Sequence, residues 1–194
     1  MSAVVSKHFR ELLGALNDAA WGLLEAHVDL IVGIDQESGS RLQRVLSDPL
    51  TEMNGFAALP PAGERVPVVH VRHGRENDDR EIVRLTLVLL GRDSDQKPYG
   101  TAWRFESPEG PGAHCYYHCQ PVRQVRSAVQ IAALQRLPAW FPDDSPTIPV
   151  NAADAYELLV SMLVAVYGHD GFDDLQQQYF SGLLAARLAE LDAT

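Results

Sequence analysis

IVRLTLVLL, residues 82–90, is the stretch that decides the fold of this chain. It is an apolar run rich in β-branched residues, which predicts a strand. VPVVHV, residues 66–71, alternates between two sets of side chains and predicts a second strand. Between them the polar, acidic stretch HGRENDDRE, residues 73–81, predicts a turn. Two strands joined in this way are expected to pair antiparallel.

Two further strands are predicted after this pair. Residues 91–97 have the composition of a turn and residues 99–106 that of a strand. SPEGPG, residues 107–112, predicts a tight connection to a last strand over residues 113–122. The sequence therefore predicts an antiparallel meander of about four strands within residues 64–122.

The first sixty residues are predicted to form an N-terminal helical region, residues 1–60. Ser6 suits the start of a long helix and Gly33 lies near its end. The spacing i, i+3, i+4, i+7 of an amphipathic helix is followed by Phe9, Leu12, Leu13, Leu16, Ala19, Ala20, Leu23, Leu24, Val28 and Ile31.

Residues 127–194 are predicted to form C-terminal helices. Asn151 is a suitable N-cap for one helix, Gly168 a natural stop, and residues 173–191 a last helix. We expect the helices from both ends of the chain to cover the apolar face of the sheet. The fold class expected is therefore α+β, as a single domain over residues 1–194.

Composition and charge narrow the classes of partner. The formal net charge is −10, with 26 acidic and 16 basic residues, which disfavours an extended nucleic acid as a partner. No apolar run approaches the ~20 residues of a membrane span, and the N-terminus lacks the pattern of a signal peptide. We therefore expect a cytoplasmic protein that does not bind a membrane.

HCYYHC, residues 114–119, places two histidines and two cysteines in six positions. On a helix, residues four apart would stand over each other as pairs of metal ligands. On a strand they would lie about 13 Å apart. Pro111, Gly112 and Pro121, together with the two tyrosines, favour the strand. No metal, no cofactor and no Cys115–Cys119 disulfide are therefore expected.

Strand alternation would sort this stretch onto two faces. Cys115, Tyr117 and Cys119 would point into the core, while the other face would carry His114, Tyr116, His118 and Gln120. A symmetric connection at residues 107–112 would place Phe105 opposite His114, Trp103 opposite Tyr116 and Thr101 opposite His118, with Arg84 on the same face. This predicts an aromatic and histidine-bearing sheet face.

Such a face is typical of recognition, and no complete catalytic constellation or nucleotide-binding motif is evident. We expect a non-catalytic binding or accessory protein, a subunit of a bacterial multi-component system, that recognises a protein partner, a second copy of itself or a small ligand. The candidate binding residues are Arg84, Trp103, Phe105, Tyr116 and Gln120.

The alternative is a hydrolase or ribonuclease-like enzyme. His114 and His118 would then be its acid–base pair, because an imidazole titrates near neutral pH. Arg84 or Arg104 would bind phosphate, and Tyr116 or Trp103 would stack on a base. Both classes of function stay open at this point.

Two families offer a partial resemblance. The order of elements, with Trp140-Phe141-Pro142 before a helix, resembles that of ubiquitin-conjugating-enzyme-like domains, but their His-Pro-Asn motif is absent. His114 and His118 give the chain a similarity to small bacterial ribonuclease toxins with histidine-rich sheets. Neither resemblance supplies a functional residue.

Overall fold

A computed structural model describes residues 2–21, 53–75, 81–92, 94–96, 98–108, 115–122, 147–183, 185 and 189. Within them lie two helices and six strands: α1 (Ser2–Trp21), β1 (Met53–Ala58), β2 (Val66–Arg75), β3 (Glu81–Arg92), β4 (Pro98–Glu106), β5 (His118–Pro121), β6 (Ile148–Pro149) and α4 (Ala155–Tyr179). The strands form one antiparallel sheet in the order β1-β2-β3-β4-β5-β6. An α+β fold with an antiparallel meander is therefore confirmed.

Strand β3 lies inside the sheet, between β2 and β4, and is buried on both faces. Val83, Leu85 and Leu87 point to the face that packs on the helices, while Val88 and Leu90 are buried on the other face. Burial on both sides explains why residues 82–90 are almost continuously apolar rather than alternating.

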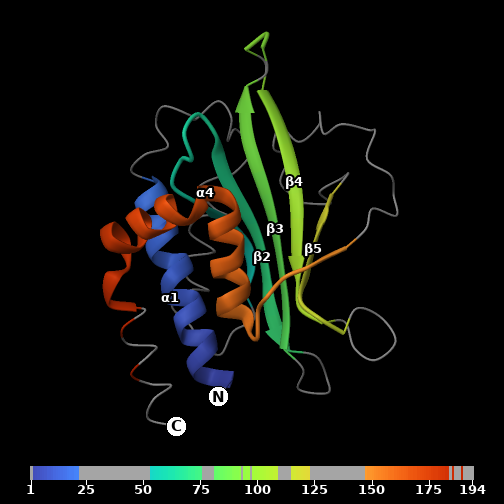
Figure 1. Cartoon of the computed structure of the whole chain (residues 1–194), viewed down its shortest axis with the longest axis vertical. Helices are drawn as coiled ribbons and strands as arrows, with labels where there is room; N and C mark the ends of the chain where they lie inside the picture. The colour runs from blue at the N-terminus through green and yellow to red at the C-terminus, as the bar shows by residue number, and fades with distance from the viewer. Residues whose placement is uncertain are drawn as a thin grey trace.

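Helices α1 and α4 contact each other and lie on the same side of the sheet (Figure 1). Phe9 and Leu13 of α1 join Leu159 and Leu163 of α4 in one buried cluster with the strand side chains, including Leu85. Burying these side chains is the main contribution to the stability of the fold, at about 1.5–3 kcal/mol for each large aliphatic group.

Helix α4 begins at a capping arrangement one turn later than the sequence predicts. The N-cap is Asp154, not Asn151: its Oδ1 accepts a hydrogen bond from the Glu157 backbone N–H at 2.9 Å. Glu157 Oε2 in turn accepts from the Ala153 N–H at 2.8 Å. One amide of the first helical turn and one amide just before the N-cap are thereby satisfied.

Gly168 interrupts α4 with a left-handed backbone, at φ 73° and ψ 176°. The label α4 therefore covers two helices that meet at this kink, and the predicted stop at Gly168 is confirmed. The second helix begins directly after Gly168, a few residues before the predicted start at residue 173, and runs to Tyr179.

The sheet has six strands instead of about four. Strand β1 lies in the region predicted to be helical, residues 1–60, and β6 lies in the region of C-terminal helices, residues 127–194. MNGFAA has a poor strand composition and β6 has two residues, so neither carries a detectable alternation. The end of the first predicted helix after Trp21, Gly33 and Trp140 lie outside the described residues.

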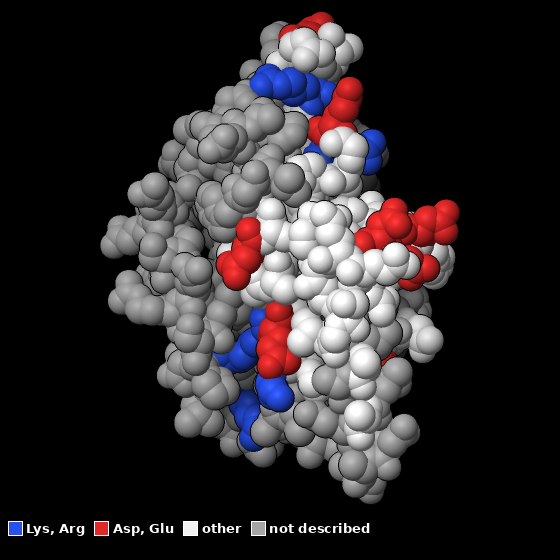
Figure 2. Space-filling model, turned by 90° about the vertical axis from the view of Figure 1, so that its left-hand side faces the viewer, with Lys and Arg blue, Asp and Glu red and all other residues white. Residues whose placement is uncertain are grey.

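Charged side chains on the described part of the surface in Figure 2 lie in separate groups, with wide uncharged areas between them. The described helices include none that is both long and apolar enough to cross a lipid bilayer.

Candidate functional site

The pairing of β4 with β5 differs from the predicted one and rearranges the site. Phe105, predicted opposite His114, pairs with Cys119, and Glu106 pairs with His118. The shift is five residues, and an odd shift moves the side chains of one strand to the other face relative to its neighbour. The cause is the start of the last strand: β4 ends at Glu106 as predicted, but β5 begins at His118 and not at residue 113.

The predicted aromatic and histidine-bearing face is therefore divided between the two sides of the sheet. Trp103 and Phe105 lie with Cys119 on the side of α4, whereas Arg84, Gln120 and His118 lie on the opposite side. Tyr116 is exposed in the segment before β5, and its hydroxyl is 3.2 Å from Thr147 Oγ1. His114 lies outside the described residues.

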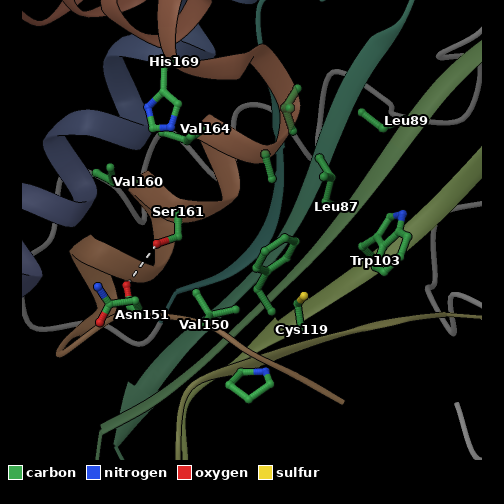
Figure 3. A pocket seen from close by; sticks show the side chains of 14 residues that line it. Leu87, Leu89, Trp103, Cys119, Val150, Asn151, Val160, Ser161, Val164 and His169 are labelled. Atoms are coloured by element: carbon green, nitrogen blue, oxygen red, sulfur yellow. Dashed lines mark hydrogen bonds between the residues drawn. The ribbon is translucent and has the colours of Figure 1, made fainter. Parts of the chain in front are cut away.

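On the helical side, a pocket of about 670 Å³ lies between the sheet and α4 (Figure 3). We call it the α4 pocket. Its described lining is largely apolar and consists of Leu87, Leu89, Trp103, Phe105, Cys119, Pro149, Val150, Asn151, Val160, Ser161, Val164, Ala165, Val166 and His169.

Helical and strand periodicity explain how these side chains reach the α4 pocket. Val160 and Val164 are four residues apart, so they lie on one face of α4. Leu87 and Leu89 are two apart on β3, as are Trp103 and Phe105 on β4, so each pair shares one face of the sheet. Leu87 and Phe105 belong to the buried core, so the floor of the pocket is continuous with it.

Few polar groups line the α4 pocket. The Ser161 hydroxyl donates to the backbone oxygen of Asn151 at 3.4 Å. Burial raises the pKa of the Cys119 thiol, which keeps it protonated and weakly nucleophilic at neutral pH. His169 is exposed, and Figure 3 shows it on the opposite side of the pocket from Cys119. These groups suit binding better than nucleophilic catalysis.

On the other face, a buried carboxylate organises a polar cluster that we call the Glu106 network. The Glu106 side chain is 3% exposed, and Arg84 Nε donates to its Oε1. Its Oε2 forms an ion pair with Arg104 Nε, accepts from Gln120 Nε2 at 3.2 Å and lies 3.6 Å from His118 Nε2. Two arginines compensate the buried negative charge, which makes the burial tolerable.

His118 is fully buried within this network. Its Nδ1 donates to the backbone oxygen of Tyr116 at 3.2 Å, and the two rings meet edge to face with centroids 6.0 Å apart. An imidazole without solvent exposure offers no access to a substrate in this conformation. The predicted acid–base pair of His114 and His118 stays a prediction, since His114 is not described.

Of the two cysteines, Cys119 lies on the predicted core side of the sheet and packs against the core, whereas Cys115 does not. Cys115 is exposed, and it lies before β5 in a segment that is not a strand, so strand alternation does not direct its side chain into the core. Cys119 is half-buried in the wall of the α4 pocket, and both thiols are free. Core packing was therefore the wrong prediction for Cys115.

Glu106 and the pocket-lining face of α4 were not among the residues singled out from the sequence. An acidic residue at the end of a strand resembles a solvent-facing one, so Glu106 gave no signal. Val160 and Val164 lie on the apolar side of a predicted helix, but periodicity does not distinguish core positions from the wall of a cavity.

Among the residues that the structure describes, no three His, Cys, Asp or Glu side chains are grouped so that they could hold a metal ion. Comparison of the chain with models of protein families, with curated proteins and with solved structures gave no significant match.

Proposed function

We propose that this protein is a non-catalytic binding protein that holds a small, uncharged and mainly apolar ligand in the α4 pocket. The observation that carries the proposal is the pocket itself: a volume of about 670 Å³ with a largely apolar lining. Pockets for small molecules usually measure about 300–1,000 Å³ and combine apolar walls with a few polar groups.

The lining favours a ligand with an apolar body and one polar end. Trp103 and Phe105 offer aromatic surfaces from the sheet, and Val160 and Val164 offer aliphatic surfaces from α4. Asn151 and His169 are exposed, so they could meet a polar group of the ligand at the mouth of the pocket. Asp170, Asp173 and Asp174 follow on the exposed surface of the same helix and disfavour an anionic ligand.

The proposal is tested by substitutions that fill the α4 pocket and should exclude a ligand. Val164→Phe adds an aromatic ring on the pocket side of α4, and Leu89→Phe does the same from the sheet. We expect the neutral fluorescent probe N-phenyl-1-naphthylamine to bind the wild type with increased emission. Each variant is expected to weaken that binding at least about tenfold, a loss of about 1.4 kcal/mol.

Gln177→Phe is the matched control, because it adds the same ring at an exposed position of α4 outside the pocket lining. Its affinity for the probe should equal that of the wild type. Circular dichroism confirms that each variant is folded. Unchanged probe affinity in both folded pocket variants contradicts the proposal, as does equal loss in the control.

A further inference from the structure

Two arginines face each other across neighbouring strands on the side of the sheet away from the helices. Arg72 of β2 is directly opposite Arg84 of β3, and Glu106 is directly opposite Arg84 on its other side. Like charges directly opposite each other in a sheet destabilise it. A pair of arginines in this position therefore needs a compensating interaction or a ligand.

Glu106 does not compensate all of the positive charge. Its carboxylate is shared by Arg84 and Arg104, and Arg72 forms no ion pair with any described residue. Among the described residues of this sheet face, three arginines against one carboxylate leave two positive charges, in a chain whose net charge is −10. The Arg84 and Arg104 side chains are 39% and 31% exposed, and Arg72 is exposed, so solvent reaches all three.

His70 lies beside this charge as a half-buried imidazole. Its ring contacts Phe56 with centroids 4.8 Å apart and makes no hydrogen bond with the described residues. Burial, then Arg72 and Arg84, lower its pKa, so the ring is neutral at neutral pH. One nitrogen of a neutral imidazole donates a hydrogen bond. His70 therefore adds a free donor next to two guanidinium groups.

We propose that His70, Arg72 and Arg84 bind the phosphate group of a small ligand. A phosphate monoester carries nearly two negative charges at neutral pH, which matches the local excess. Guanidinium groups bind its oxygens through charge-assisted hydrogen bonds. Because Arg84 Nε is held by buried Glu106, the guanidinium is positioned before the ligand arrives, which lowers the entropic cost of binding.

This site is separate from the α4 pocket, since the two lie on opposite faces of the sheet. Absence of phosphate binding would therefore leave the proposed α4 pocket untouched, and absence of probe binding in the pocket would leave the phosphate site untouched.

The experiment compares thermal unfolding of the wild type, Arg72→Gln and Arg92→Gln with inorganic phosphate, sodium acetate or sodium chloride at equal ionic strength and neutral pH. Arg92→Gln makes the same change of charge at the far end of β3, about 26 Å along the strand from Arg84. Arg72 is exposed and has no ion pair with a described residue, so its replacement leaves the fold intact.

A ligand that binds the folded state raises its unfolding temperature. Phosphate is expected to do so for the wild type and Arg92→Gln, while acetate and chloride have little effect. Affinity for phosphate in Arg72→Gln should be at least about tenfold weaker, because one charge-assisted contact is lost. The imidazole signals of His70 should shift on addition of phosphate to the wild type.

Equal stabilisation by phosphate, acetate and chloride would mean general charge screening and overturn the proposal. So would an unchanged phosphate response in Arg72→Gln, or the absence of any response in the wild type.

Discussion

Glu106 is the residue on which most interactions of the polar sheet face depend. It is an acid in a strand, nearly removed from solvent, and it contacts side chains of β3, β4 and β5. Its contacts with Arg84 and Arg104 are ion pairs, and its hydrogen bond from Gln120 is charge-assisted. The carboxylate therefore fixes the relative position of three strands as well as the direction of Arg84 and Arg104.

Glu106→Gln should destabilise the protein by about 2–3 kcal/mol, because it removes the buried negative charge that both arginines contact. Their partial exposure limits the cost, since water can solvate part of each guanidinium. Urea denaturation followed by circular dichroism measures the change. Glu64→Gln, at an exposed turn position, is the control and should stay within about 0.5 kcal/mol of the wild type.

At the scale of the elements, the kink in α4 depends on the backbone conformation of one residue, Gly168. Gly168 combines φ 73° with ψ 176°, a region that is accessible almost exclusively to glycine. A Cβ atom there would meet nothing within 4 Å, so the cost of a side chain comes from the backbone alone. Gly168→Ala should therefore lower the free energy of unfolding by about 1–3 kcal/mol.

Gly182→Ala is the matched comparison. A Cβ atom at Gly182 also meets nothing within 4 Å, but this residue does not have a positive φ. Its replacement should be neutral or stabilise by up to about 1 kcal/mol, because alanine restricts the unfolded chain. Thermal or chemical unfolding measures both changes. Similar destabilisation by the two alanines would contradict the prediction that the backbone conformation of Gly168 causes the cost.

Elements with a strong periodic signal could be predicted from the sequence. β2 and β3 were predicted at 66–71 and 82–90 and found at Val66–Arg75 and Glu81–Arg92. β4 was displaced by one residue at its start. These strands are long and carry many apolar or β-branched side chains, so local pattern and tertiary burial agree.

The strand pairing that determines the site could not be predicted in the same way. Faces within β5 follow from alternation alone, so His118 and Gln120 were correctly separated from Cys119. Their partners on β4 depend on where β5 begins. The predicted pairing was displaced by an odd number of residues, so Trp103 lies on the opposite side of the sheet from His118 and not on the same side. The α4 pocket depends on packing between distant elements, for which the sequence holds no local signal.

The stability of the whole molecule should depend on pH through His70. Its pKa in the folded protein is below the ordinary value of 6.5. Below about pH 6.5, His70 is therefore protonated more fully in the unfolded chain than in the folded protein. The free energy of unfolding should therefore fall as the pH drops below about 6.5 and be unaffected by this residue above it.

His70→Gln isolates this contribution, because the other histidines titrate equally in both proteins. The stability difference between wild type and His70→Gln, measured by urea denaturation, should shift against the wild type as the pH is lowered from neutral. A difference that stays constant with pH would contradict the role assigned to His70.

The two ends of the described chain meet in one layer, with consequences for synthesis on the ribosome. α1 packs on α4, and the Tyr167 hydroxyl donates to the backbone oxygen of Pro60, 107 residues earlier, at 2.6 Å. Helix α1 leaves the ribosome before α4, so it gains its contacts with α4 only after that helix has emerged. Until α4 emerges, Phe9 and Leu13 lack part of the surface that buries them, so completion of this core requires the synthesis of α4.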